Sequence, residues 1–452
     1  MDRMMTKADR MIQACKLATI GAGALSLAAC GVFGGEDTRS TPTVGNRTPI
    51  LSRVATEIVP DPSLASVPVT LPVPVATADW PQAGGNAAKA PGHVTLSASP
   101  SRVWTAQVDG ATKTRRLAAA PVIGAGSLFV VDSSGVVHAF DAATGTKRWS
   151  HRIEVSGDLR DSTFGGGASF ADGKVYATSG TGDVVALEAA TGNRLWRKKP
   201  AGPLRGSPTV AFNSVYVMTQ DNQIHALSAE TGEPVWQDAA GSGQSGVFGV
   251  AAPAAAQGSV IAGYSSGELV AYRYENGRNL WSDALARTSI STQVGSLTDV
   301  DADPIIESGR VYALGQGGRM AAYQLTTGQR IWDLTIAGIS TPAIAGSWLF
   351  TLTDDAKLLA IAKDTGRIRW VTQLEAWRDV KDREGPIFWT GPVLASGRLW
   401  VASSRGVVRS VDATTGVAAY FTELNDGVSV PPVVAGGTLY ILDDGGRITA
   451  WR

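Results

Sequence analysis

Short apolar runs separated by turn residues recur at a fixed distance along residues 121–452. A typical block contains "APVIGAG" (120–126), "SLFVVDS" (127–133) and "GVVHAF" (135–140). Apolar runs of this length, bounded by Gly, Pro, Ser and Asp, are typical of β-strands. Each block therefore predicts three short strands joined by tight turns.

A second pattern overlaps the end of each block and predicts a hairpin to a fourth strand. In "AFDAATGTKRW" (139–149) a small residue opens the unit, Gly145 falls in the turn and Trp149 follows four residues later. Gly suits a turn position that needs a positive φ, and an acidic residue such as Asp141 can accept hydrogen bonds from turn N–H groups. The pattern recurs at 186–196, 226–236, 271–281, 322–332 and 360–370, more weakly at 410–420 with Tyr420 in place of Trp, and begins again at Ala450.

The repeated tryptophans have two interpretations, a ligand-stacking platform or packing between units. Their strict repetition favours packing, because a large apolar side chain can wedge between neighbouring sheets.

The spacing upstream of each unit fixes the number of repeats. A proline lies eighteen residues before the small residue of every unit except the second, where Ala168 takes its place; these prolines are Pro121, Pro208, Pro253, Pro304, Pro342, Pro392 and Pro432. Eight blocks of equal length with a fourth strand each predict an all-β fold, an eight-bladed β-propeller of four-stranded antiparallel blades. The last block lacks its own fourth strand, so we expect residues 101–108, with Trp104, to complete that blade and close the ring.

Length variation is confined to the segment between each Trp and the next block. It is ten residues from Trp332 to Pro342 but 23 from Trp281 to Pro304. In a four-stranded blade these are the connections from an outer strand to the next inner strand, and they share one face. Variable loops on a rigid scaffold are where binding tends to occur. In the connection from Trp370 to Pro392, Trp377 and Trp389 are either interface anchors or side chains folded back onto the ring.

The longest connection carries "SLTDVDADP" (296–304), with Asp299, Asp301 and Asp303 at alternate positions. An EF-hand calcium loop also begins in this way but needs Gly at its sixth position and Glu at its twelfth. Counting from Asp299, those positions hold Pro304 and Arg310. The pattern does not support a metal site.

The balance of charged residues bears on whether the chain binds nucleic acid. The 40 acidic and 40 basic side chains balance, which argues against nucleic-acid binding.

Basic residues near the N-terminus precede the apolar run "LATIGAGALSLAA", which is too short to span a bilayer. That run ends in "LAAC", and small residues before Cys30 resemble a bacterial lipobox, which implies a signal peptide at residues 1–29. Cys15 lies in the removed segment, so Cys30 is the one cysteine left for lipidation.

The segment after Cys30 differs in composition from the repeats. Residues 30–78 are rich in Pro, Thr, Ser and Val and show no strand or helix period, which predicts a disordered tether between the lipid anchor and the propeller, residues 79–452. The residue after the cysteine is Gly31 and not Asp. By resemblance to bacterial lipoproteins, this implies the periplasmic face of the outer membrane.

Few residues of the sequence are candidates for catalysis. The four histidines, His93, His138, His151 and His225, have no metal-ligand spacing. The repeat resembles that of PQQ-dependent dehydrogenases, which hold a quinone in the central funnel, usually with calcium and a vicinal disulfide. This chain has two cysteines in all, one of them inside the signal peptide. We therefore expect no enzyme activity and no cofactor or metal.

The lipobox, the Pro-rich tether and the eight repeats together resemble the BamB family, lipoprotein scaffolds of the outer-membrane β-barrel assembly machinery. Two loops sharpen the resemblance: "LTDVDADP" (297–304) is similar to an "L-S-D-V-D-x-x-P" loop of the family, and "PLRGSP" (203–208) to its "S-L-R-G-x-x-P" loop. "DWPQAGGN" (79–86) resembles the start of its propeller.

The resemblance implies partners and contact residues. In the family these two loops contact the periplasmic POTRA domains of the barrel protein BamA, which transfers here to Leu204, Arg205, Asp299 and Asp301. It also implies acylation of Cys30, with palmitate, and help in folding and inserting unfolded outer-membrane clients. The carboxylates then have two readings, as groups that bind the partner or as groups that fix the loop. A generic periplasmic protein- or ligand-binding propeller is the alternative function, followed by the dehydrogenase.

Overall fold

The computed structural model describes residues 58–155, 165–241, 251–285 and 299–452. Glu57–Arg452 forms one compact unit. The predicted signal peptide, Cys30 and the tether as far as residue 57 lie outside the described residues. No helix within the described ranges is long and apolar enough to cross a membrane; a single 3₁₀ turn, η2 (Pro62–Leu64), precedes the strands.

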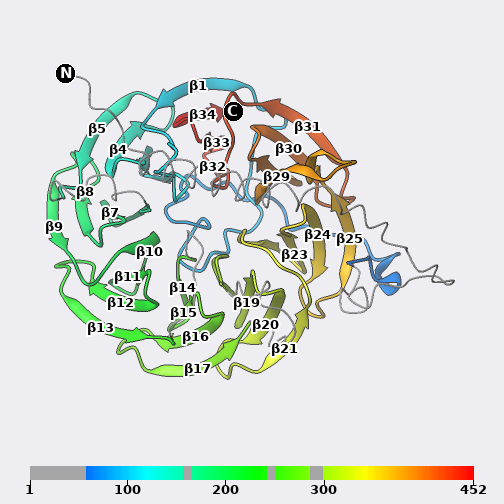
Figure 1. Ribbon diagram of the computed structural model, residues 1–452, viewed down its shortest axis with the longest axis horizontal. Helices are drawn as coiled ribbons and strands as arrows, with labels where there is room; N and C mark the ends of the chain where they lie inside the picture. Colours follow the sequence, from blue (N-terminus) through cyan, green and yellow to red (C-terminus); the bar gives the residue numbers. More distant parts are fainter. Residues whose placement is uncertain (1–57, 156–164, 242–250, 286–298) are drawn as a thin grey trace, which may run out of the picture. The chain divides into compact units, whose positions relative to one another are not determined.

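The predicted propeller is confirmed: the described strands form eight four-stranded antiparallel sheets arranged as a ring (Figure 1). The first three blades, from inner to outer strand, are β2 (Val122–Gly124), β3 (Ser127–Val131), β4 (Val136–Asp141) and β5 (Lys147–Arg152); β6 (Ala168–Ala171), β7 (Lys174–Thr178), β8 (Val184–Glu188) and β9 (Arg194–Lys198); and β10 (Leu204–Ala211), β11 (Ser214–Thr219), β12 (Gln223–Ser228) and β13 (Pro234–Ala239).

The fourth to sixth blades follow the same order. They are β14 (Ala254–Ala256), β15 (Ser259–Gly263), β16 (Glu268–Arg273) and β17 (Asn279–Ala284); β18 (Ile305–Glu307), β19 (Arg310–Gly315), β20 (Arg319–Gln324) and β21 (Arg330–Leu334); and β22 (Ala343–Ala345), β23 (Trp348–Leu352), β24 (Lys357–Ala362) and β25 (Ile368–Gln373). A small two-stranded sheet, β26 (Trp377–Asp379) and β27 (Glu384–Pro386), comes next.

The last two blades close the ring. The seventh blade is β28 (Trp389–Ala395), β29 (Arg398–Ser403), β30 (Val407–Asp412) and β31 (Ala418–Glu423), and the closing blade is β32 (Val433–Ala435), β33 (Thr438–Leu442), β34 (Arg447–Trp451) and β1 (Arg102–Gln107). β1 pairs antiparallel with β34, and Ser101 and Arg452 exchange two backbone hydrogen bonds of 2.9 Å. The predicted closure by residues 101–108 is therefore confirmed.

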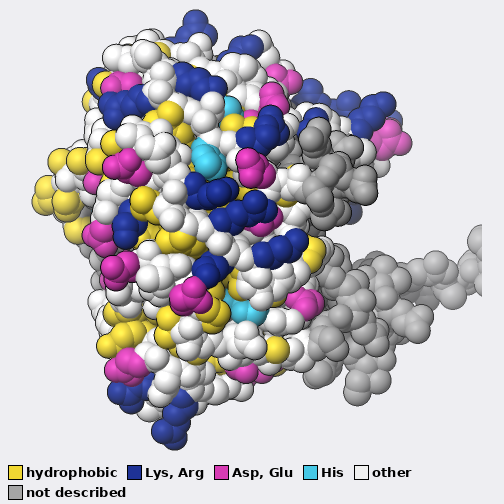
Figure 2. Space-filling view, turned by 90° about the vertical axis from the view of Figure 1, so that its left-hand side faces the viewer, with side chains coloured by type: hydrophobic (Ala, Val, Ile, Leu, Met, Phe, Trp, Pro, Cys, Tyr) yellow, Lys and Arg dark blue, Asp and Glu magenta, His cyan; other side chains and the backbone are white. Residues whose placement is uncertain are grey.

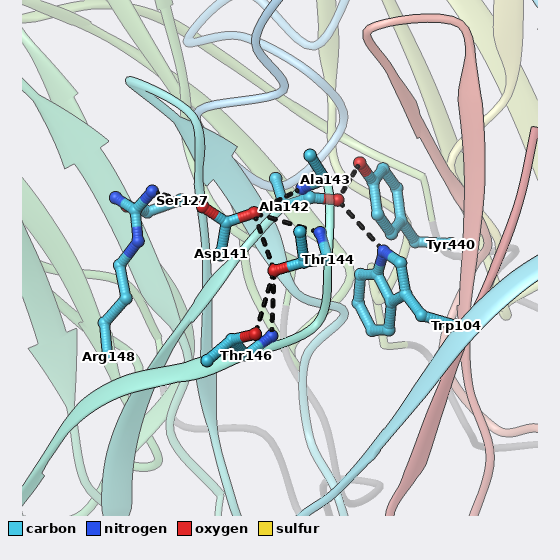
Figure 3. A network of polar contacts seen from close by, with 9 residues as sticks. All are labelled: Trp104, Ser127, Asp141, Ala142, Ala143, Thr144, Thr146, Arg148 and Tyr440. Carbon is cyan, nitrogen blue, oxygen red and sulfur yellow. Dashed lines mark hydrogen bonds and ion pairs between the residues drawn. The ribbon is translucent and has the colours of Figure 1, made fainter.

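The repeated tryptophan of each blade docks on the hairpin turn of the next blade. The indole N–H of Trp104, in the closing blade, donates to the Ala142 carbonyl of the first blade (3.1 Å), where the Tyr440 hydroxyl also donates (Figure 3). Gly145 in that turn has φ 72°, and a Cβ there would lie 2.5 Å from Cε3 of Trp104. Only glycine therefore allows the indole to lie flat on the turn.

The turn itself is held by Asp141, whose carboxylate accepts from the N–H groups of Ala143 (3.0 Å) and Thr144 (2.9 Å) and pairs with Arg148 (Figure 3). The same indole-to-carbonyl hydrogen bond, between 2.7 and 3.2 Å, recurs at six more seams: Trp149 to Ala189, Trp196 to Ala229, Trp236 to Tyr274, Trp281 to Leu325, Trp332 to Lys363 and Trp370 to Ala413. The packing interpretation of the tryptophans is thus confirmed.

The seventh blade departs from this pattern. In the other blades the small residue of the third strand pairs with the tryptophan, as Ala360 does with Trp370. In the seventh blade Ser410 pairs with Ala419, because the bulge between β30 and β31 lies at Val408/Arg409. A one-residue shift reverses the faces of a strand, so Tyr420 is 60% exposed. Tyr420, which stands in place of Trp in the weaker seventh repeat, therefore does not pack against the next blade.

Residues 59–97 form a segment, here called the inner belt, that contacts all eight blades. In Figure 1 its first residues lie outside β25 and the rest crosses the middle of the ring. Val69 is buried in the cluster shared by the sixth and seventh blades. Hydrogen bonds of 2.7 to 3.3 Å join Trp80 to Ile123, Pro81 to Phe170, Gln82 to Val210, Ala87 to Ala255, Ala88 to Ile306, Asp61 to Ile368, Val94 to Leu394 and Thr77 to Gly436. Part of the segment predicted as tether, residues 59–78, therefore contacts the ring through Asp61, Val69 and Thr77.

The belt also places a lysine in the interior. Lys89 is 1% exposed, and its ammonium group donates to the Ala83 carbonyl (3.0 Å) and to Thr209 Oγ1 (3.1 Å). Burial lowers the pKa of Lys89 to about 8, an effect that the nearby Asp303 carboxylate opposes. Nothing in the sequence distinguishes this lysine from those on the surface.

Replacing one docked tryptophan tests the seam packing. Trp281 is 8% exposed, so Trp281→Ala removes a buried indole and its hydrogen bond, and we expect a loss of about 3–5 kcal/mol in the free energy of unfolding. Tyr420→Ala, at the undocked position, is the matched control and should change it by less than about 0.5 kcal/mol. Urea denaturation of both variants measures the difference, and equal losses would contradict the docking interpretation.

Lys89 gives a pH prediction. Between pH 8 and 10 the unfolded chain keeps the lysine protonated while the folded chain releases the proton, so the free energy of unfolding rises with pH. Relative to Lys89→Met, the wild type should gain about 2 kcal/mol between pH 7 and 9.5. Parallel stability curves for the two proteins in urea titrations would show that Lys89 does not titrate in this window.

Candidate functional site

The blade order places the predicted site residues on one face of the ring. Neighbouring strands in each blade are antiparallel, so the turns between second and third strands lie on the same side as the links from one blade to the next. We call this side the connection face; its described links include residues 199–203, 299–304 and 374–388. The hairpin turns on which the tryptophans dock lie on the opposite side, the turn face.

The "PLRGSP" loop is built into the ring. Leu204 opens β10, is 2% exposed and packs in a cluster with Tyr176 and Trp196. Arg205 pairs through its backbone with Met218; its side chain lies outside the described part of the structure. Gly206 donates from its backbone N–H to the Gly165 carbonyl (3.1 Å). The loop therefore lies against the second blade.

The "LTDVDADP" loop is fixed in a similar way. The Asp299 carbonyl accepts from Gln316 N (2.8 Å), and Val300 N donates to Tyr264 O (3.2 Å). Asp303 Oδ1 accepts from Ala252 N (2.7 Å), and burial raises the pKa of Asp303. Asp303 therefore fixes its loop to the fourth blade.

The structure places the other two carboxylates away from solvent. Asp299 is 1% exposed, and both carboxylate oxygens of Asp301 are inaccessible to solvent. This burial suits loop-fixing groups better than groups that reach a partner directly. The assignment of Leu204, Arg205, Asp299 and Asp301 to partner binding stays a prediction.

Hydrogen bonds between turns join the two loops into one continuous band across three blades. Gln220 N donates to Pro203 O (2.9 Å) beside the first loop. Asn222 Oδ1 accepts from the backbone N–H (3.1 Å) and hydroxyl (2.7 Å) of Ser265 in the fourth blade. The carbonyl of Tyr264, the residue before Ser265, accepts a hydrogen bond from the backbone N–H of Val300 in the second loop. We call this band, formed by residues 203–206, 220–222, 264–265 and 299–303, the loop band.

The link from the sixth to the seventh blade forms a hairpin, β26–β27. Trp389 is buried, and its indole donates to Glu375 O (2.8 Å), so this side chain is folded back. Trp377 is half-buried. The exposed apolar side chains of this link are instead Val380 (77%) and Phe388 (61%). Of the two interpretations of this link, Trp389 fits a side chain folded back onto the ring. The sequence pattern did not single out the exposed aromatic residue, Phe388.

Titratable side chains on the connection face stabilise the turns there through hydrogen bonds. Asp132 Oδ1 accepts from the backbone N–H groups of Ser134 and Val136 (both 2.9 Å), while its Oδ2 lies 2.7 Å from His138 Nε2. Burial raises the pKa of Asp354 to about 6, with Asp355 adding to the effect. Within the described ranges no group of three or more His, Cys, Asp and Glu side chains could hold a metal ion.

Comparisons with known proteins agree with this architecture. The model of one family, described as outer membrane protein assembly factor BamB, matches residues 90–162 and 133–372. The assembly factor BamB of Yersinia pestis is 26% identical over 358 residues, which span 78% of this chain and 89% of that protein. The BamB of Vibrio cholerae is 34% identical over 256 residues, 57% of this chain and 66% of that protein.

Solved structures give the same architecture. The crystal structure of BamB from Moraxella catarrhalis superposes with a TM-score of 0.66 at 20% identity, covering 78% of this chain and 99% of that one. A quinohemoprotein alcohol dehydrogenase from Pseudomonas putida also reaches 0.66, at 13% identity over 83% of this chain and 80% of that one. At such identities both likenesses concern the fold alone. With the family model matching most of the repeats, the chain belongs to the BamB family.

Proposed function

We propose that this protein is a non-catalytic subunit of an outer-membrane protein assembly machinery. The observation that carries the proposal is family membership, because the relatives are named as assembly factors. The proposed location is the periplasmic face of the outer membrane, with the chain anchored through lipid on Cys30. The proposed mechanism needs no cofactor, because positioning a partner requires only a rigid surface.

The proposed partner is a BamA-type barrel protein, bound through its POTRA domains at the loop band. Support comes from the rigidity of the band, since hydrogen bonds between turns tie its two loops to neighbouring blades. Leu204 and Asp299 are buried, so their proposed role is to hold the backbone in shape. Arg205 is the proposed charged contact.

Unfolded barrel clients are proposed to pair with the free edges of outer strands. Each outer strand pairs on one side only, and an extended peptide can add to such an edge. Lys and Arg side chains spread over the side of the ring that Figure 2 shows, and β5 and β9 carry Lys147, Arg148, Arg194 and Lys198. Positive charge discourages edge pairing. The edges of β13, β17 and β21 carry exposed Val235, Leu280 and Ile331 with fewer basic groups.

Affinity capture tests the partner assignment. The full-length lipoprotein is purified from gently solubilised native membranes and its partners are identified by mass spectrometry. A BamA-type barrel protein is the expected partner. Recovery of a different periplasmic protein in its place would favour the generic binding propeller.

Substitution in the loop band refines the same assignment. Asp299→Asn combined with Asp301→Asn keeps the side-chain volume and removes two buried charges that are proposed to fix the loop. We expect the loop to hold its shape less well and the amount of captured barrel protein to fall about threefold. Asp364→Asn, on the turn face, is the control and should leave capture unchanged. Equal capture by both variants would exclude the loop band.

Charge added to the open edges tests client binding. Leu280→Lys combined with Ile331→Lys should reduce photo-crosslinking to an unfolded outer-membrane barrel severalfold, because lysine opposes strand addition. Leu195→Lys, on the already basic β9, is the matched control and should have little effect. Equal yields for the two variants would contradict pairing at β17 and β21.

A further inference from the structure

One seam of the ring lacks the interaction that joins the others. Between the seventh and closing blades no indole docks on a hairpin turn, since Tyr420 faces solvent and Phe421 meets Trp451 edge-on instead, with ring centroids 5.9 Å apart. There is also no hairpin turn to receive an indole, because β34 and β1 are not consecutive in the chain. The backbones of Ser101 and Arg452 meet there instead.

A cavity of about 390 Å³ lies at this seam. Its walls come from the chain leading into β1 and from the seventh blade, and its rim includes exposed residues of the segment 97–99 and Tyr420. An apolar cavity of roughly 150 Å³ is enough to hold benzene, so this one has room for an indole or phenol ring. Its lining residues include four serines and, among the others, Leu96, Ala395, Arg398, Trp400, Ala419 and Phe421.

The lining offers aromatic contacts. Trp400 is 3% exposed and meets Phe421 edge-on, with ring centroids 4.9 Å apart. Tyr420 stands at the rim. Aromatic rings prefer such offset or edge-to-face neighbours at 4.5–7 Å, so a planar ring entering the cavity gains contacts of the kind that the docked tryptophans make at the other seams.

The cavity also presents a cation. Arg398 lines it, is half-buried, and donates from Nε to Ser410 Oγ (3.0 Å). No carboxylate of the described residues lies within 4 Å of its guanidinium. Arg310, at the same repeat position in the fifth blade, pairs with Asp364 instead. The remaining N–H groups of Arg398 suit a carboxylate, which arginine binds in a bidentate manner.

We propose that this seam binds a planar aromatic group that carries a carboxylate. The ring occupies the aromatic cavity and the carboxylate meets Arg398. A free aromatic acid has this chemistry, and so does an aromatic residue at the C-terminal carboxylate of a polypeptide. The site lies beside the turn face and is separate from the loop band, so it does not depend on the proposed partner.

Ligand-observed NMR with the full-length chain in detergent tests the proposal, with N-acetyl-tryptophan as the probe. Saturable binding is expected below about 10 mM, the weak range for a fragment. N-acetyl-tryptophanamide, which lacks the carboxylate, should bind about tenfold more weakly. No saturable binding of the acid, or equal binding of acid and amide, would overturn the proposal.

Two variants and a matched control localise the binding. Arg398→Met should weaken binding of the acid about tenfold, and Ala419→Leu, which fills the cavity, should abolish it. Arg310→Met removes the equivalent arginine in the fifth blade and should leave binding unchanged. Thermal melting of each variant confirms folding, and loss of binding in Arg310→Met, or its retention in both cavity variants, would place the probe elsewhere.

A pair of peptides distinguishes the two possible ligands, a free aromatic acid and the C-terminus of a polypeptide. A six-residue peptide ending in tryptophan with a free carboxylate is compared with its C-terminal amide. Tighter binding of the free-acid peptide than of N-acetyl-tryptophan identifies a polypeptide terminus as the ligand. Binding of the small acid alone identifies a free aromatic acid.

Discussion

The structure depends on one repeated contact, an indole laid on the glycine of the next blade's hairpin turn. The contact needs both members: the indole supplies apolar area and one N–H donor, and the glycine supplies a positive φ and the absence of a Cβ. Each blade buries little by itself, because a four-stranded sheet has two apolar faces. Packing against its neighbours buries both, so the ring is stable only as a whole.

The inner belt adds a second kind of link, from one extended segment to every blade. Most of its hydrogen bonds run to the inner strands on the turn face, and that of Asp61 runs to the outer strand β25, which leaves the connection face to the variable links. This division separates the parts of the ring that hold it together from the parts free to vary. The loop band shows that even these links are fixed where they carry buried aspartates.

The seam at the seventh blade shows what happens when the repeated contact is lost. A bulge displaced toward Val408 turns Tyr420 outward and Phe421 inward. The ring stays closed through the pairing of β1 with β34. Phe421 contacts Trp451 of the closing blade, and a cavity remains beside Arg398. Closure and seam packing are therefore separable in this fold.

The sequence by itself determined the number of blades, the four strands of each and the closing role of residues 101–108, because strand and turn preferences repeat with a constant spacing. It also placed the two candidate loops on one face, since antiparallel order alone requires this. Tertiary structure alone decided the burial of Asp299 and Leu204, the docking of residues 59–78 and the buried ammonium group of Lys89. These features depend on which distant backbone groups a segment meets, as when Ala83 and Thr209 receive Lys89, and such long-range partners leave no local pattern in the sequence.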